Sequence, residues 1–172
     1  EVYFAGNVFG PGSAAEYAVI DHRIVAHKPK TLNHVVAASV PLTLLTAWEA
    51  FEDKLRIPVP APGSAEEKLN ASKTVLVVAG AGGVGSIAVQ LAKKIFKFGK
   101  VVATAGRADS QAWTLKQGAD VTLDRSRPYE AQLKDLGISG FDYILSCSSI
   151  DDILDQLISI SKPFGQICSI VE

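Results

Sequence analysis

Hydrophobic and polar positions follow one clear pattern in the middle of the chain. Residues 74–79 form a continuous apolar run, Thr-Val-Leu-Val-Val-Ala, as expected for a central parallel strand covered on both faces. Apolar residues then recur at helical spacing up to residue 95, while Lys93, Lys94 and Lys97 take the opposite face. A second strand-like run follows at residues 100–104. The pattern predicts one strand–helix–strand unit over residues 73–106.

A glycine-rich turn, Gly80-Ala81-Gly82-Gly83-Val84-Gly85, joins the first strand to the helix. In such a GxGxxG motif we expect Gly80 to permit the tight turn, Gly82 to let backbone N–H groups approach a pyrophosphate, and Gly85 to let the helix pack closely on the strand. The pyrophosphate would face a helix N-terminus. Alternatives are a plain turn and a membrane span over residues 74–92, but glycines within so short a run disfavour the span. The motif in this context predicts a dinucleotide site.

The residues after the second strand, Ala105-Gly106-Arg107, indicate which dinucleotide is bound. An NAD site normally carries Asp or Glu about 20 residues past the glycines, where it binds the ribose hydroxyls. Here that position is Ala105, and the first carboxylate is Asp109. A small residue leaves room for a 2′-phosphate, to which Arg107 can offer a fork of donors. We therefore predict NADP (NADPH) as the cofactor, the alternative being that Arg107 is simply solvated.

Helix and strand patterns continue to alternate after Arg107, which predicts an α/β fold with a doubly wound parallel Rossmann sheet. Expected helices cover residues 111–117, 128–137 and 150–158, the last with Asp151 and Asp152 in its first turn; expected strands cover residues 121–123, 141–146 and 166–171. Ligands of such sheets lie beyond the carboxyl ends of the strands. These ends are at Ala79, Thr104, Cys147 and Val171.

The chain before residue 73 has a different pattern. Short strand candidates lie at residues 2–4, 16–20 and 24–26. Asn33 is expected to cap a helix that runs toward Asp53 and is kinked or broken at Pro41. Residues 56–72, with three prolines and a glycine, are expected to form a polar connector.

Composition narrows the functional classes. The 172 residues are 48% hydrophobic with a net charge of −1, so we expect no basic surface that would bind nucleic acid. We also expect a cytoplasmic protein that does not enter membranes. Cys147 and Cys168 lie in apolar runs and are expected to be reduced core thiols. The three histidines show no ligand spacing, so no metal site is predicted. The lack of methionine and the strand-like ends suggest an internal fragment.

Four motifs in order resemble the medium-chain dehydrogenase/reductases, and among them the quinone oxidoreductase branch in the group labelled zinc-type alcohol dehydrogenase-like. They are Gly12-Ser13-Ala14-Ala15-Glu16-Tyr17, residues 41–50 (Pro-Leu-Thr-Leu-Leu-Thr-Ala-Trp-Glu-Ala), the glycine turn, and residues 103–107. The resemblance implies that residues 1–32 end a GroES-like catalytic domain and that residues 33–72 form a linking helix and connector. Residues 73–172 would then be a dinucleotide-binding domain lacking its last strand.

The same resemblance assigns roles to single residues. It implies that residues 82–85, including Gly83, hold the pyrophosphate, that Val84 and Thr46 lie near the nicotinamide, and that Thr104 and Arg107 occupy the ribose-phosphate position. Gly106 stands where close relatives tend to have Ser, so one possible hydroxyl contact to the ribose phosphate is missing and more of its binding depends on Arg107. The groups that position the acceptor are expected outside this chain, so no catalytic residue is nominated.

Leu42 bears on the chemistry that the resemblance implies. In the zinc-dependent branch a metal-binding Cys stands four residues before the threonine matched by Thr46, and here that position is Leu42. The resemblance thus implies that the protein transfers a hydride to a small carbonyl or quinone substrate, that is, to an enone or a quinone. It also implies that the protein forms homodimers. A zinc-dependent alcohol dehydrogenase and a non-catalytic dinucleotide-binding protein remain as alternatives. A methyltransferase is disfavoured because Ala105 replaces the acidic residue expected after its second strand.

Overall fold

The structure is a computed structural model that describes residues 1–7, 9–10 and 12–171. Its contacts divide the chain into two compact units, Glu1–Thr46 and Ala47–Glu172. The predicted division at residues 32 and 72, with a GroES-like first part, stays a prediction. Within the residues described, no helix is long and apolar enough to cross a membrane.

The first unit contains little regular structure. Strand β1 (Val2–Tyr3) pairs antiparallel with β2 (Ala26–His27). A 3₁₀ helix, His22–Ile24, occupies the start of the strand expected at residues 24–26, because the Asp21 carboxylate accepts the Arg23 N–H at 2.9 Å and favours a turn. The strand expected at residues 16–20 is wrong: these residues are irregular, with Tyr17 and Val19 exposed.

The helix expected after Asn33 is present in pieces. The Asn33 side chain accepts the Val36 N–H at 2.9 Å and caps α1 (His34–Ala38). A new helix, α2 (Pro41–Glu49), begins at the proline and leads into a π-helical turn, Ala50–Lys54. The predicted break at Pro41 is confirmed, since proline fits the first position of a helix but not its interior.

The second unit is built on a five-stranded parallel sheet with the order β5-β4-β3-β6-β7. The strands are β3 (Thr74–Val78), β4 (Lys100–Ala105), β5 (Val121–Asp124), β6 (Phe141–Ser146) and β7 (Ser161–Ser169). The chain runs outward from β3 to β5 and then returns to β6 on the other side of β3. This reversal is the doubly wound topology, and the predicted fold is confirmed.

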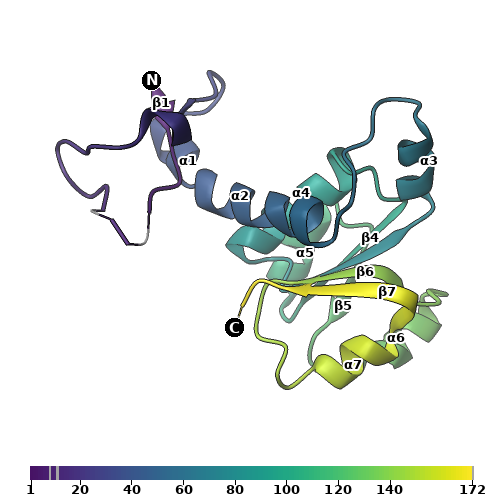
Figure 1. Cartoon of the computed structure of the whole chain (residues 1–172). Coiled ribbons are helices and arrows are strands. Elements are labelled where there is room, and N and C mark those ends of the chain that lie inside the picture. Colours follow the sequence, from purple (N-terminus) through teal and green to yellow (C-terminus); the bar gives the residue numbers. More distant parts are fainter. Residues whose placement is uncertain (8, 11, 172) are drawn as a thin grey trace. The chain divides into compact units, whose positions relative to one another are not determined.

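Helices cover both faces of this sheet. Figure 1 shows α4 (Gly83–Lys94) and α5 (Ala108–Gln117) on one side, and α6 (Tyr129–Asp135) and α7 (Leu154–Ser159) on the other. A buried cluster packs α6 and α7 onto the sheet, and includes Leu76, Val102, Leu123, Tyr129, Leu133, Ile144 and Leu157. The opposite face buries Val75, Val77, Val101, Ala88 and Val89. Strands covered on both faces explain the continuous apolar runs.

One helix lies where a polar connector was expected. Helix α3 (Ala65–Ala71) begins after Ser64, whose hydroxyl accepts the Glu67 N–H at 3.2 Å. Glu67 in turn accepts the Gly63 N–H at 2.5 Å. The Ser-Ala-Glu-Glu sequence is a capping box, which predicts the start of a helix. The three prolines before it favoured an irregular connector, and the helix was therefore not predicted.

The C-terminal elements also differ from expectation. Helix α7 begins at Leu154, so Asp151 and Asp152 precede its first turn, and the Ser149 hydroxyl donates to Asp151 at 2.7 Å in a separate turn. Strand β7 begins at Ser161 rather than at residue 166. Its register shifts between Phe141↔Ser161 and Tyr143↔Gln166, so extra residues of β7 form a bulge. The bulge accommodates Pro163 and Gly165 inside a strand.

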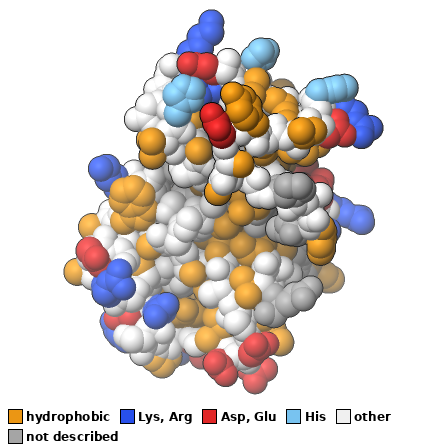
Figure 2. Space-filling view, turned by 90° about the vertical axis from the view of Figure 1, so that its left-hand side faces the viewer, with side chains coloured by type: hydrophobic (Ala, Val, Ile, Leu, Met, Phe, Trp, Pro, Cys, Tyr) orange, Lys and Arg blue, Asp and Glu red, His pale blue; other side chains and the backbone are white. Residues whose placement is uncertain are grey.

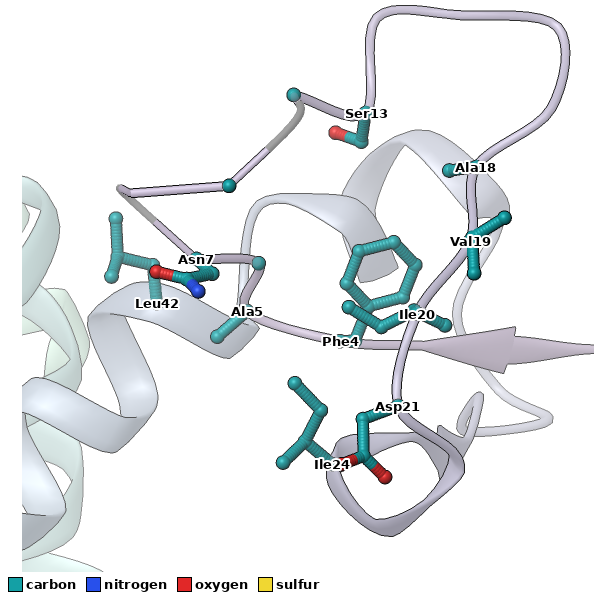
Figure 3. Close-up of a pocket in the computed structure, with 13 residues that line it drawn as sticks. Phe4, Ala5, Asn7, Ser13, Ala18, Val19, Ile20, Asp21, Ile24 and Leu42 are labelled. Atoms are coloured by element: carbon teal, nitrogen blue, oxygen red, sulfur yellow. The ribbon is translucent and has the colours of Figure 1, made fainter.

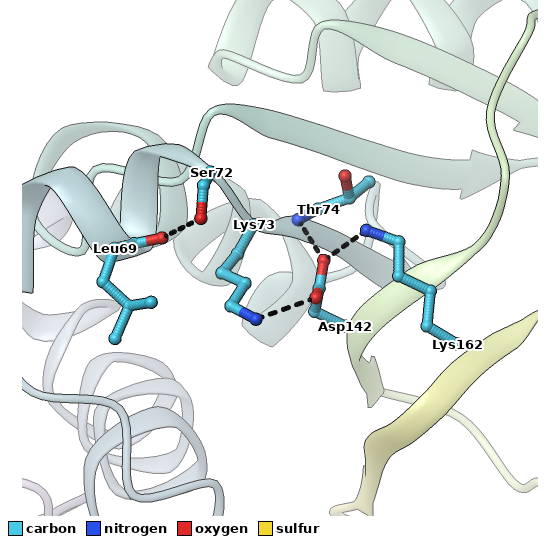
Figure 4. Close-up of polar contacts among 6 residues, drawn as sticks. All are labelled: Leu69, Ser72, Lys73, Thr74, Asp142 and Lys162. Carbon is cyan, nitrogen blue, oxygen red and sulfur yellow. Dashed lines mark hydrogen bonds and ion pairs between the residues drawn. The ribbon is translucent and has the colours of Figure 1, made fainter.

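An ionic cluster joins three strands at the amino end of the sheet. Asp142 accepts the Thr74 N–H at 2.9 Å and pairs with Lys73 at 3.2 Å and Lys162 at 2.7 Å, as Figure 4 shows. On the face displayed in Figure 2, acidic and basic side chains are interspersed with hydrophobic and uncharged ones, in keeping with the net charge of −1.

Candidate functional site

A hollow of about 520 Å³ opens at the carboxyl ends of β3, β4 and β5, where ligands of doubly wound sheets bind. Four predicted residues line it: Gly82, Thr104, Gly106 and Arg107. The other lining residues are Ala79, Ala81, Ala105, Ser110, Arg125 and Ser126. The structure therefore brings the glycine turn and the segment after β4 together at one site.

The glycine turn owes its shape to close packing. A Cβ on Gly85 would lie 2.3 Å from the Ala79 carbonyl oxygen, and one on Gly80 would lie 2.7 Å from the Ala103 Cβ. Gly85 therefore allows the close approach that the motif predicts. The left-handed residue of the turn is Ala79, with φ of 57°, rather than Gly80. Gly80 is needed for contact with β4 rather than for its own backbone conformation.

The backbone of Gly82 is engaged within the turn. Its N–H donates to the Ala79 carbonyl at 3.0 Å, and its carbonyl accepts the Ser86 N–H at 2.8 Å at the start of α4. Gly83 and Val84 occupy the first turn of α4 and do not line the hollow. The N–H groups of a first helical turn have no partner within the helix, so those of residues 83–85 are the donors that α4 offers to an anion.

Thr104 forms part of the floor of the hollow and is almost fully buried. The residue is 1% exposed, and its hydroxyl oxygen accepts the Ala79 N–H at 2.9 Å. The hydroxyl thus ties β4 to the glycine turn. Its predicted contact with the cofactor ribose stays a prediction.

Arg107 projects from the start of α5. Its Nε donates to the Asp109 carboxylate at 3.2 Å, and the two side chains are 79% and 74% exposed. The Ser110 backbone N–H, together with Arg107, holds the pKa of the Asp109 carboxyl below its usual value although desolvation opposes the shift. An ion pair this exposed contributes little energy, so Arg107 can exchange Asp109 for another anion.

Three lining residues were not predicted: Ser110, Arg125 and Ser126. Arg125 follows β5 and packs against Gly106, because a Cβ on Gly106 would lie 3.0 Å from the Arg125 Nε. The sequence carried no local signal for Arg125, because its place depends on which strands lie side by side in the sheet. Parallel neighbours place the residues after their carboxyl ends side by side, here through the pairing of Ala105 with Asp124.

A second hollow, of about 320 Å³, shares Ala79, Thr104 and Arg125 with the first. It is also lined by Val78, Tyr129, Ser148, Ser149, Asp152 and Ile153. Cys147 directly precedes Ser148 in the sequence, and its N–H donates to the Val78 carbonyl at 3.2 Å. Cys147 itself lines neither this hollow nor the first one. Burial, with a smaller contribution from Cys168, raises the pKa of the Cys147 thiol to about 12. A cofactor contact by Cys147 stays a prediction.

The first unit carries a hollow of its own, of about 420 Å³. Figure 3 shows it between the segment after β1 and the segment before the 3₁₀ helix, with Leu42 of α2 at its edge. Asn7, Ser13 and Asp21 bring polar side chains to its lining, and the Asp21 carboxylate is already paired with Arg23 at 2.5 Å. Thr46 also belongs to this unit, and its hydroxyl donates to the Leu42 carbonyl at 2.8 Å. The place of Thr46 near the nicotinamide stays a prediction.

Comparison with known families decides the class of the protein. The model of the family described as "Zinc-binding dehydrogenase" matches residues 83–170. The chain belongs to this family. It is a medium-chain dehydrogenase/reductase, as the order of its motifs implied.

Relatives in this family support the assignment along nearly the whole length of the chain. A zinc-type alcohol dehydrogenase-like protein of Staphylococcus epidermidis is 40% identical over 170 residues, which is 99% of this chain and 48% of the relative. A crystal structure from Rhizobium etli CFN 42, of a protein assigned to the zinc-dependent alcohol dehydrogenases, is 40% identical with a TM-score of 0.85, and the match covers 98% of this chain and 47% of that one. The chain thus spans about half the length of the relatives it matches.

The names of two other relatives differ in the cofactor. A chloroplastic NADPH-dependent alkenal/one oxidoreductase of Arabidopsis thaliana is 31% identical over 159 residues, covering 92% of this chain and 36% of the relative. A crystal structure described as an NAD-dependent alcohol dehydrogenase is 32% identical with a TM-score of 0.77, covering 94% of this chain and 44% of that one. Membership of the family therefore shows a dehydrogenase fold without choosing between NAD and NADP.

The family name also raises the question of zinc. Among the residues that the structure describes, His, Cys, Asp and Glu side chains do not gather in any group of three that could hold a metal ion. Leu42, where the zinc-dependent branch is expected to have a cysteine, offers no donor atom. The donor set of this part of the chain does not fit a zinc ion.

Proposed function

We propose that this chain forms the NADPH-binding part of an oxidoreductase that transfers hydride to a quinone or an enone. The proposal rests on the segment Ala105-Gly106-Arg107 at the wall of the larger hollow. Ala105 is the buried last residue of β4, and it stands where an NAD site has a carboxylate that binds the ribose hydroxyls. Arg107 is exposed beside it, and its ion pair with Asp109 is weak enough to be exchanged for a phosphate.

The residues of the second unit fit a dinucleotide. A side chain at Gly82 would come within 3.3 Å of the Ala79 carbonyl, so the motif keeps the start of α4 open. The first-turn N–H groups of Gly83, Val84 and Gly85 would hold the pyrophosphate. Gly80 would shape the turn, and Thr104, Gly106 and Arg107 would border the ribose and its 2′-phosphate. When bound, the nicotinamide supplies the hydride.

Further proposals concern residues and partners beyond this hollow. Val84 and Thr46 are proposed to lie near the nicotinamide, and Cys147 at the edge of the cofactor site. The acceptor is proposed to be a small enone or quinone, supported by the name of the Arabidopsis thaliana relative and by the resemblance to quinone oxidoreductases. This activity, like homodimer formation, is a proposal for the whole protein, because the chain spans about half of the relatives' length.

Titration of the chain with NADPH and with NADH tests the proposal. Tighter binding of NADPH is expected, and Arg107→Ala should weaken it about ten- to a hundredfold, as for the loss of one charge-assisted contact of about 1.5–3 kcal/mol. Arg127→Ala is the matched control, because Arg127 is also an exposed arginine but lines neither hollow. Equal binding of the two cofactors would contradict the NADPH assignment and favour an NAD-dependent dehydrogenase, as one structural relative is named.

A further inference from the structure

Arg125 packs across the backbone of Gly106. A Cβ built on Gly106 would lie 3.0 Å from the Arg125 Nε, 3.3 Å from its Cγ and 3.4 Å from its Cδ. A side chain at position 106 would therefore crowd Arg125, and the Arg125 side chain would have to shift by a few tenths of an ångström to accommodate it. Gly106 is flanked by two arginines, Arg107 along the chain and Arg125 across the sheet.

The sheet register holds Arg125 in this place. Ala105 of β4 is paired with Asp124 of β5, and the Arg125 N–H donates to the Ala105 carbonyl at 3.4 Å. The segments that follow the two strands therefore leave the sheet side by side. The backbone of Arg125, in the turn directly after β5, is therefore positioned by the pairing of β5 with β4.

The charge of Arg125 is not neutralised by a neighbour. Within residues 1–7, 9–10 and 12–171, Arg125 forms no ion pair, whereas Arg107 is paired with Asp109 at 3.2 Å. Arg125 also lines both hollows, between the glycine turn on one side and Tyr129 and Ser149 on the other. An unpaired guanidinium at the junction of two hollows is suited to bind a phosphate group.

We propose that Arg125 is a second specificity-determining residue of this site and binds the 2′-phosphate of NADPH together with Arg107. The inference rests on the proposed binding of NADPH. It changes the meaning of Gly106, whose missing side chain gives up a hydroxyl contact but makes room for a second guanidinium. Arg107 and Arg125, which follow two different strands, can donate to one phosphate from two directions, which a single arginine cannot do.

Titration of the purified chain with NADPH and NADH, and competition by 2′,5′-ADP and by 5′-AMP, tests this role. Arg125→Gln should weaken binding of NADPH and 2′,5′-ADP about ten- to a hundredfold and leave NADH and 5′-AMP unchanged, because only the first pair carries the 2′-phosphate. Arg125→Lys keeps the charge without the fork and should fall between wild type and Arg125→Gln. Arg127→Gln is the matched control and should match the wild type, and melting temperatures verify that each variant is folded.

The outcomes separate the inference from the proposed function. A wild-type chain that prefers NADPH, with the preference intact in folded Arg125→Gln, would overturn the role of Arg125 and leave the NADPH assignment standing. A wild-type chain that binds both cofactors equally, or neither, would overturn the NADPH assignment and the role of Arg125 together. Equal weakening of NADPH and NADH by Arg125→Gln would also overturn the inference, since it would place Arg125 on a part that the two cofactors share.

Discussion

The hydroxyl oxygen of Thr104, near the end of β4, accepts the backbone N–H of Ala79 at 2.9 Å, just past the end of β3. The Thr104 carbonyl accepts the N–H of the next residue, Gly80, at 3.1 Å. Ala79 is held at a φ of 57°, a left-handed conformation that costs a non-glycine residue about 1–2 kcal/mol. One buried threonine thus supports the strained entrance to the glycine turn, and through it the start of α4.

Replacement of Thr104 should show the value of this support. Thr104→Val keeps the shape of the side chain but leaves the Ala79 N–H buried without its acceptor, which should lower the free energy of unfolding by about 1–3 kcal/mol. Thr104→Ser keeps the hydroxyl and should cost less. Urea unfolding of the three proteins measures the difference, and equal stabilities for Val and Ser would show that the hydrogen bond contributes nothing.

Two glycines of the turn, Gly82 and Gly85, should differ in their tolerance of alanine. Gly85→Ala places a Cβ 2.3 Å from the Ala79 carbonyl and 2.7 Å from the Gly80 Cα, so the backbone must move at a cost of about 1–3 kcal/mol or more. Gly82→Ala meets the same carbonyl at 3.3 Å and should be tolerated better. Thermal unfolding ranks the two variants. A Gly82→Ala variant less stable than Gly85→Ala would contradict the packing of this turn.

The Asp142 cluster should make stability depend on pH at the acid end. Burial alone would raise the pKa of the Asp142 carboxyl, but hydrogen bonds from Lys162, Thr74 and Lys73 hold it below its usual value. A lowered pKa in the folded state means that the carboxylate stabilises the fold above the pKa of the unfolded chain and that this contribution is lost as the pH falls through the folded pKa.

Asp142→Asn isolates this contribution. Its side-chain oxygen can still accept the Thr74 N–H but no longer pairs with the two lysines. At pH 7 the variant should be less stable than the wild type by roughly 1–3 kcal/mol, and the gap should shrink as the pH falls below about 4. Urea midpoints from pH 2 to 7 follow it. A gap that is constant with pH would assign the loss to packing rather than to charge.

Cys147 should react slowly while the protein is folded. Burial raises the pKa of its thiol to about 12, and burial also raises the pKa of Cys168, so few thiolates are present at pH 8. Ellman's reagent should label both cysteines slowly in buffer and rapidly in denaturant, with Cys147→Ser and Cys168→Ser assigning the two phases. Fast labelling of the folded Cys168→Ser variant would show that Cys147 is accessible and ionised.

Local sequence patterns predicted strands and helix ends correctly where a single strong signal was present. The apolar runs of β3 and β4, the cap at Asn33, the break at Pro41 and the end of α5 at Gln117 all lie as predicted, because each depends on near neighbours. Helix α3 and the early start of β7 were missed where prolines and glycines suggested irregular chain. In β7 the bulge beside β6 absorbs Pro163 and Gly165, and a bulge is decided by the partner strand.

The candidate site shows the same division. Gly82, Gly106 and Arg107 could be located from the motif and the count of residues after it, since all three lie close in sequence to a strand end. Arg125 could not, because its contact with Gly106 joins segments that follow two different strands. The burial of Thr104 at the floor of the hollow, with its hydroxyl accepting the Ala79 N–H, likewise comes from the packing of β4 beside β3.

The sequence by itself determined the order of strands and helices after residue 73, the glycine turn between β3 and α4, and the lack of a carboxylate at Ala105, because these depend on residue types within a few positions of one another. Only the tertiary structure decided that Ala79 rather than Gly80 takes the left-handed conformation and that Arg125 lies against Gly106. Strand register and the close approach of backbones set these contacts, and both arise from pairing between segments distant in the chain.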